Sequence, residues 1–201
     1  MAQEIIDIFK KHNINVVIAK SKEDAVEKIM SMIPQGSKVG HSESITLEQI
    51  GIFDRIKNNN YVFYDGKSVE KGTTEYEVLF KNAMLSDIYL CGTNAITLDG
   101  KLVNKDCYGN RVSAMLFGPK KVIVVVGKNK IVDNVDSALK RIENIAAPKN
   151  AQRLNKLTPC TSVGRCMDCD APDRICHSTV IIERQMPDRM TLVIINEELG
   201  F

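Results

Sequence analysis

Four cysteines lie within a short stretch near the end of the sequence: Cys160, Cys166, Cys169 and Cys176. Their spacing is C-x5-C-x2-C-x6-C, and a C-x2-C pair lets two sulfur atoms face one ion from a tight turn. Two more thiols from flanking loops would complete four-fold ligation, which suits Zn²⁺ or an iron–sulfur cluster. The spacing matches neither the ferredoxin run nor a usual zinc ribbon, so the metal's identity is undecided. Free thiols packed in loops are the alternative interpretation.

The remaining thiols and the nearest imidazole carry weaker signals. His177 directly follows Cys176 and is a weaker candidate ligand, because its position at the start of a predicted strand favours an exposed side chain. Cys91 and Cys107 are isolated in the sequence, and the apolar strand around Cys91 predicts a buried residue there.

Three glycine-containing turns share a second pattern, in which small polar residues follow a predicted strand or precede a predicted helix. In an open α/β sheet, ligands bind at the carboxyl ends of strands, where helix N-termini offer free N–H groups to anions. Arg111 would hold the anion with its fork of donors, and Ser42 and Asn94 would position it. Taken singly, each of these residues is more typical of a cap, a turn or a solvated surface, and only together do they indicate a pocket for a small anion. The candidate ligand-binding residues are Gly40, Ser42, Ser44, Thr46, Gly92, Thr93, Asn94, Gly109, Asn110 and Arg111.

His41 is the best candidate for a catalytic acid or base, because it lies in a strand-to-helix turn and imidazole titrates near neutral pH. A structural role is the alternative for a single histidine in a turn. Glu43, Asp99 and Asp106 are possible carboxylate partners, but no spacing pairs them with it. The chain has neither a P-loop nor a G-x-G-x-x-G fingerprint, so no motif indicates ATP or NAD.

The elements that would position these residues alternate along the chain. Alternation of strands and helices predicts an α/β fold with an open, mostly parallel sheet flanked by helices on both faces. Helix caps are predicted at Ser21, Thr74 and Asp133, and Pro148 is expected to end the helix that Asp133 caps. Apolar runs predict strands at 15–19, 37–40, 61–64, 87–91 and 121–126, and helical periodicity predicts helices at 3–12, 44–50, 75–85 and from 133 to about 146.

Two antiparallel hairpins are predicted in addition to the parallel sheet. Asp99-Gly100 separates two short apolar segments at 95–97 and 102–103, which is a hairpin signal. A second hairpin is expected at the C-terminus, with strands at 180–183 and 191–195 around Pro187-Asp188. The absence of linkers and repeats favours one domain over 1–201, with 158–177 as a cysteine-rich, metal-binding appendage.

Composition excludes several classes of protein. Hydrophobic residues make up 44% of the chain and charged residues 26%, with a net charge of +2, so disorder is not expected. The charges are scattered, which argues against nucleic-acid or polybasic membrane binding. The N-terminus does not resemble a signal peptide, and the longest apolar run, 122–126, is too short to span a bilayer. We therefore expect a cytoplasmic protein whose cysteines are thiols or metal ligands.

A long central run then carries a resemblance to a known family. It consists of Gly92 to Thr97, Asp99 to Asn104, Gly109 to Val112 and Phe117 to Lys121. This run resembles the central signature of the LUD (lactate utilisation domain) family.

The turn at 40–47, the tail from 158 to 176 and the ending Gly200-Phe201 are similar to short stand-alone members of that family. The resemblance implies a fold related to the phosphosugar isomerase and CoA-transferase superfold. It also implies a part in the oxidation of lactate to pyruvate, in complexes whose partner subunits carry iron–sulfur clusters. The sequence departs from the family pattern at Cys107, where glycine is expected, and it lacks a ferredoxin-type double-cluster run.

Three functional hypotheses follow. The first is a lactate-utilisation-type protein that binds a small anionic metabolite in a cleft formed by the turns at 40–46, 92–94 and 109–111. The second is a non-catalytic assembly or regulatory subunit with a structural metal. The third, which rests on fold analogy alone, is an isomerase- or transferase-like enzyme acting on a phosphorylated or CoA-linked substrate.

Overall fold

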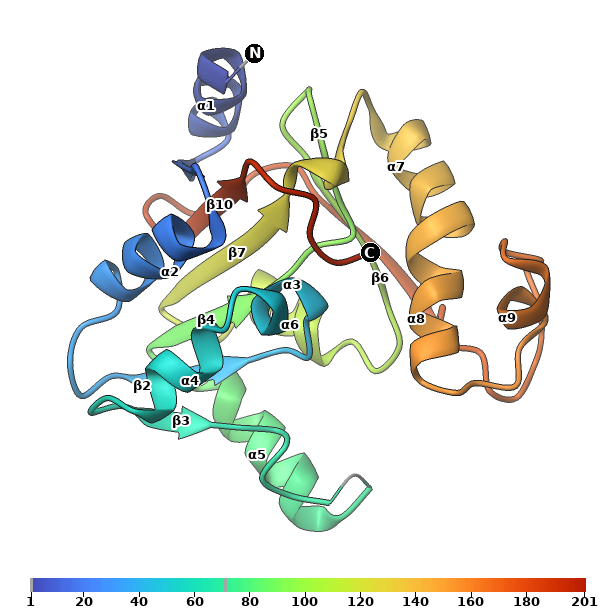
Figure 1. Cartoon of the computed structure of the whole chain (residues 1–201), viewed down its shortest axis with the longest axis horizontal. Helices are drawn as coiled ribbons and strands as arrows, with labels where there is room; N and C mark the ends of the chain where they lie inside the picture. Colours follow the sequence, from blue (N-terminus) through green and yellow to red (C-terminus); the bar gives the residue numbers. More distant parts are fainter. Residues whose placement is uncertain (1, 71) are drawn as a thin grey trace.

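A parallel sheet forms the centre of the computed structural model, which describes residues 2–70 and 72–201 (Figure 1). Among these residues, six strands pair in the order β1-β10-β7-β4-β2-β3, and every pair is parallel. The strands are β1 (Ile14–Ala19), β2 (Lys38–His41), β3 (Val62–Tyr64), β4 (Ile88–Cys91), β7 (Lys121–Gly127) and β10 (Met190–Ile195). The predicted mostly parallel sheet is confirmed.

Helices cover both faces of this sheet, also as predicted. Helices α1 (Ala2–Lys11), α5 (Thr74–Met84) and α6 (Asn110–Leu116) pack on one face, and α2 (Lys22–Ser31), α3 (Ile45–Gln49) and α4 (Ile52–Lys57) pack on the other. Strand β7 shows why its sequence is continuously apolar: Val122, Val124 and Val126 enter one core, and Ile123 and Val125 enter the other. No helix in the described ranges is long and apolar enough to cross a membrane.

The caps of these helices agree with the sequence to within one residue. The side chains of Ser21 and Ser44 accept hydrogen bonds from the backbone N–H groups three residues later, as N-caps do. Thr73 caps α5 and Asn134 caps α7 (Val135–Arg141), each next to the residue predicted. When two neighbouring residues both have a side-chain oxygen, either could accept the hydrogen bond from the helix N-terminus. The sequence pattern therefore locates the cap only to within one residue.

A smaller mixed sheet lies beside the first, in the order β8-β5-β6-β9. Strands β5 (Ala95–Thr97) and β6 (Leu102–Asp106) are antiparallel, which confirms the hairpin predicted around Asp99-Gly100. The other members are β8 (Ile131–Val132), parallel to β5, and β9 (Ser178–Ile182), antiparallel to β6.

The predicted hairpin at the C-terminus was wrong, because β9 and β10 belong to different sheets. Strand β10 is buried at five of its six positions and lies between β1 and β7, where both faces of a parallel strand are covered. Strand β9 is largely exposed and pairs with β6 at the edge of the small sheet. A buried strand and a largely exposed strand therefore join different sheets, although only a short turn at Pro187-Asp188 lies between them in sequence.

Pro148 does not end a helix as predicted. Helix α7 continues through a π-helical turn, Ile142–Ala146, into α8 (Ala147–Arg153), where Pro148 occupies the first turn. Inside a regular helix, proline removes a hydrogen bond and clashes with the carbonyl four residues earlier. The wider π turn relieves both effects and lets the chain run on. Helix α9 (Pro159–Val163) follows in the cysteine segment.

Candidate functional site

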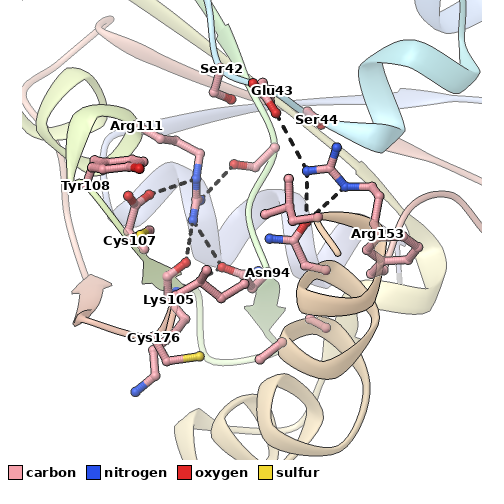
Figure 2. Close-up of a pocket in the computed structure, with 18 of the residues that line it drawn as sticks. Ser42, Glu43, Ser44, Asn94, Lys105, Cys107, Tyr108, Arg111, Arg153 and Cys176 are labelled. Carbon is pink, nitrogen blue, oxygen red and sulfur yellow. Dashed lines mark hydrogen bonds and ion pairs between the residues drawn. The ribbon is translucent and has the colours of Figure 1, made fainter. Parts of the chain in front are cut away.

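A cavity of about 680 Å³ lies where β2 and β4 end (Figure 2). This is the carboxyl edge of the parallel sheet, where open α/β folds bind ligands. The three predicted turns all contribute to it, together with α8 and the segment 172–177. Of the candidate residues, those in the lining are Ser42, Ser44, Gly92, Thr93, Asn94, Asn110 and Arg111. Gly40, His41, Thr46 and Gly109 lie outside it.

Arg111 points into a ring of protein oxygen atoms rather than into open space (Figure 2). One terminal nitrogen, Nη1, donates to the Gly92 carbonyl at 3.1 Å and to Asn104 Oδ1. The other, Nη2, donates to Asn94 Oδ1 at 3.2 Å and to the Lys105 carbonyl at 2.9 Å. These contacts join the ends of β4 and β6 through a single side chain.

The last guanidinium donor completes the set. Arg111 Nε lies 3.1 Å from Asp106 Oδ2, and the other carboxylate oxygen of Asp106 accepts from Gly109 N. A guanidinium has five N–H donors, and each of them has an acceptor here. The geometry therefore favours a positioning role for Arg111, in place of the anion-holding role suggested by sequence.

Lys130 is the residue of the site that sequence reasoning missed. Its side chain lines the cavity with only 5% exposure, and Nζ lies 3.1 Å from Thr46 Oγ1 and 3.2 Å from the Thr93 carbonyl. Within the described residues no carboxylate pairs with it. Burial lowers the pKa of Lys130 to about 7, and the positive charges of Arg141 and Arg111 act in the same direction. Its sequence context, Lys-Asn-Lys before a short strand, looks like ordinary surface.

Ser42 presents an unused hydroxyl to the same cavity. The residue is 3% exposed, and its Oγ has no hydrogen-bond partner among the described residues. Its backbone N–H donates to the Leu90 carbonyl, which fixes the turn at the end of β2. Buried polar groups are nearly always hydrogen-bonded, so this hydroxyl is suited to contact a ligand. Asn104 Nδ2 is similarly unpartnered, but Asn104 is outside the lining.

The outer wall carries Arg153 from α8. Its Nε and Nη2 donate to Asn150 Oδ1 at 3.1 and 3.0 Å, and Nη2 lies 3.7 Å from Glu43 Oε2 (Figure 2). In the described part of the chain, Nη1 has no acceptor. Glu43 also accepts from the Tyr76 hydroxyl at 3.4 Å. Burial and the Glu43 charge raise the pKa of Tyr76 to about 12, so that hydroxyl remains a donor at neutral pH.

The charge balance of the lining favours an anion. The acidic residues in the lining are Glu43, Asp106 and Asp173, and Asp106 is already neutralised by Arg111. Five charged basic residues also lie in the lining, namely Lys105, Arg111, Arg153, Lys156 and Arg174, together with Lys130, whose burial favours the uncharged amine. A cleft lined mainly by one sign of charge concentrates ligands of the other sign.

His41 is buried but is not among the residues that line the cavity. Its Nδ1 donates to the Ser42 carbonyl at 3.0 Å, and its Nε2 lies 3.5 Å from Asp65 Oδ1. The ring lies against Phe53 and Phe63, at centroid distances of 4.5 and 5.1 Å. Burial lowers the pKa of His41, although Asp65 and the Ser42 carbonyl partly oppose this shift. These contacts fit a structural role that anchors the end of β2.

The cysteine segment forms part of the cavity rim. Cys176 lines the cavity, and burial raises the pKa of its thiol, with the neighbouring Cys166 and Cys160 acting in the same direction. All six cysteines are free. Cys91 is fully buried in β4, as predicted, and burial raises its pKa to about 12. Cys107 Sγ lies 3.8 Å from His177 Nδ1.

These thiols are not arranged as a metal site. Across residues 2–70 and 72–201, no group of three or more His, Cys, Asp or Glu side chains is placed to hold a metal ion. Cys160 Sγ contacts Thr158 Oγ1 at 3.2 Å, and Cys166 Sγ accepts from Asp168 N at 3.4 Å. The side chains as placed therefore do not fit a bound ion or cluster.

The predicted metal site can be tested directly, and it requires the segment at 158–177 to draw its four sulfurs together on binding. If the prediction holds, protein purified without air contains stoichiometric zinc or iron, with broad visible absorbance in the case of a cluster. Cys169→Ser should lose the metal and Cys107→Ser should keep it. Metal analysis that finds neither element would contradict the prediction.

Comparisons with known proteins agree with the observed fold. A family model described as the LUD domain matches residues 2–195. A DUF162 family protein from Deinococcus radiodurans is similar in structure, with a TM-score of 0.58 at 10% identity, over 97% of this chain and 96% of that chain. Ribose 5-phosphate isomerase A from Methanocaldococcus jannaschii matches only partly, with a TM-score of 0.36 at 13% identity, over 57% and 55%.

No curated protein matches the sequence. The likeness to the DUF162 protein is one of fold alone, because the identity is low. The family model, in contrast, spans both sheets and the turns that line the cavity. The chain belongs to the LUD domain family, which is associated with lactate utilisation.

Proposed function

We propose that the cavity binds a small anionic metabolite and that the protein takes part in oxidising lactate to pyruvate, together with iron–sulfur partner subunits. The observation that carries the proposal is the buried Ser42 hydroxyl, which has no partner among the described residues and faces a cavity with an excess of basic side chains. An anionic ligand would satisfy both features. The family membership supplies the association with lactate.

The residues assigned to the anion differ from those suggested by sequence. Arg153 takes the place of Arg111, because its Nη1 group has no acceptor in the described part of the chain while all donors of Arg111 are used. Ser42 keeps its assigned role and would donate its hydroxyl. Charge-assisted hydrogen bonds from a guanidinium to a carboxylate are among the strong ones in proteins.

The volume of the cavity limits the ligand only loosely. Sites for small molecules and cofactors span about 300–1,000 Å³, and this cavity of about 680 Å³ lies within that range. A three-carbon acid would fill only part of it. Larger anions, including phosphorylated metabolites, therefore belong in the same binding test.

Calorimetric titration at low salt with lactate, pyruvate and phosphorylated metabolites tests the proposal. At least one of these anions should bind, and Arg153→Met should weaken binding by about 10- to 100-fold, the value of one charged hydrogen bond. Arg55→Met is the matched control, because Arg55 pairs with Glu27 at 2.9 Å and is not in the lining. If no anion binds, the cavity is not an anion site.

The proposed association with iron–sulfur subunits is tested by a separate experiment. Affinity purification from the native host grown on lactate should recover iron–sulfur subunits together with this protein. Recovery of such subunits by a protein that binds no metabolite would instead favour the role of a non-catalytic assembly subunit.

A further inference from the structure

The amine of Lys130 lies in an unusual setting at the wall of the cavity. It sits at the end of the 3-10 turn Lys128–Lys130, and its two hydrogen-bond partners, Thr46 Oγ1 and the Thr93 carbonyl, are neutral. The Thr46 hydroxyl donates a hydrogen bond to the Leu199 carbonyl at 3.5 Å, so its oxygen is free to accept one from Lys130. A lysine this buried is normally paired with a carboxylate.

The count of hydrogen atoms favours the uncharged form of this amine. A neutral amine has two N–H groups and one lone pair, and the two N–H groups match the two acceptors at Thr46 and Thr93. A charged ammonium group has a third N–H, for which no acceptor exists among the described residues. The guanidinium groups of Arg111 and Arg141 also disfavour a third positive charge, and burial brings the pKa of Lys130 to about 7.

The backbone around Gly200 holds the amine in place. A Cβ atom added at Gly200 would lie 2.4 Å from Thr46 Oγ1 and 3.0 Å from Lys130 Nζ, so only glycine fits at this contact. Gly200 is itself fixed by a hydrogen bond from its N–H to Gln49 Oε1 at 2.7 Å. Because Thr46 and Thr93 accept both N–H groups of the uncharged amine, its lone pair is unused at the wall of the cavity, as a nucleophilic lysine requires.

We propose that Lys130 is a nucleophilic amine that forms an imine with the carbonyl group of a small 2-oxo acid bound in the cavity. The inference rests on the proposed function and narrows its ligand to the carbonyl-containing acids. The lone pair of Nζ attacks the carbonyl carbon, and one N–H proton passes to the oxygen to give a carbinolamine. Loss of the hydroxyl with the second proton then gives the imine and one water, so no oxidant or reductant is needed.

Reductive trapping tests this step on the unmodified protein. Pyruvate or 2-oxobutyrate is added, then sodium borohydride, which converts an imine into a stable secondary amine. Peptide mass spectrometry should find one reduced adduct, on Lys130. Lactate has no carbonyl group at C2 and should give no adduct. The yield should rise from pH 6 to pH 8, because the reactive form is the unprotonated amine and its fraction increases through the pKa of about 7.

Variants separate this site from general lysine reactivity. Lys130→Met should abolish the adduct, whereas Lys128→Met, which removes an exposed amine from the same turn, should leave the yield unchanged. An adduct spread over several surface lysines, or none with either 2-oxo acid, overturns the proposal. Calorimetry on the same samples distinguishes the two failures: if the 2-oxo acid binds without an adduct, only the imine is lost, and if no anion binds, the proposed function is lost as well.

Discussion

Replacing Arg111 with methionine is expected to lower the free energy of unfolding by about 3–5 kcal/mol. The substitution leaves Asp106 buried with a single N–H donor, from Gly109, and removes the partners of two backbone carbonyls. Removing one member of a buried ion pair is costly because the remaining charge cannot regain water. Urea denaturation at pH 7 measures the loss.

Arg111→Lys keeps the positive charge but is also expected to destabilise the protein, because the two side chains differ in shape. A lysine has one charged nitrogen and cannot reach the separate acceptors at Gly92, Asn94 and Asp106 that the guanidinium joins. It should therefore recover less than half of the lost stability. Arg153→Met is the comparison, with an expected loss below about 1 kcal/mol, since Arg153 is 30% exposed and its ion pair is long.

The two arginines thus have opposite expected phenotypes. Arg111 variants should lose stability, and Arg153 variants should lose anion binding. If Arg111→Lys kept its stability and lost anion binding, Arg111 would be the anion-holding residue that the sequence suggested, and the positioning role would be wrong.

Gly40→Ala is expected to destabilise the protein by about 1–3 kcal/mol, the usual cost of inserting a methyl group into a filled core. A Cβ atom at this position would lie 2.6 Å from the Ala83 carbonyl oxygen and 2.9 Å from Ala83 Cα. Both are backbone atoms of α5, so the contact is relieved only by moving the helix away from β2. Denaturation midpoints compared at constant m-value give the loss.

Gly66→Ala is the matched control for Gly40→Ala. The nearest neighbour of its added Cβ is Phe80 Cζ at 3.4 Å, an ordinary contact with a side chain. The expected change is within about 0.5 kcal/mol of zero. Equal losses in both variants would mean that α5 is not packed against Gly40 as described, and that this glycine belongs to the ligand-binding turn as its sequence context suggested.

Local pattern was sufficient for much of the site. A strand followed by a turn rich in glycine and serine is recognisable from sequence. Parallel strands place all such turns at the same edge of the sheet, the edge of their carboxyl ends. The sequence alone therefore indicates Ser42, Gly92 and Asn94, which lie in the cavity lining. The same pattern predicts that Gly40 contacts the ligand, whereas in the structure Gly40 allows α5 to pack closely against β2. The sequence cannot distinguish these roles, because glycine is required in both wherever another group approaches the backbone closely.

Local sequence patterns do not predict contacts between residues that are far apart in the sequence. Arg111 lines the cavity, but its five acceptors come from β6 and from the turn after β4, and only the folded chain shows that they use all of its donors. Arg153 reaches the cavity because a π-helical turn carries the helix past Pro148. The strands at 178–182 and 190–195 looked like a hairpin until pairing partners in two sheets separated them.

By itself the sequence determined the alternation of strands and helices, the caps to within one residue, the family, and the edge of the sheet at which small polar turns gather. These depend on neighbours a few positions apart, which periodicity and turn chemistry record. Only the tertiary structure shows which acceptors the donors of Arg111 and Arg153 use, and that Lys130 is buried with no carboxylate partner among the described residues. The charge state of a buried side chain depends on the local dielectric, and the number of its unused donors depends on acceptors from distant segments of the chain. A local sequence pattern contains neither kind of information.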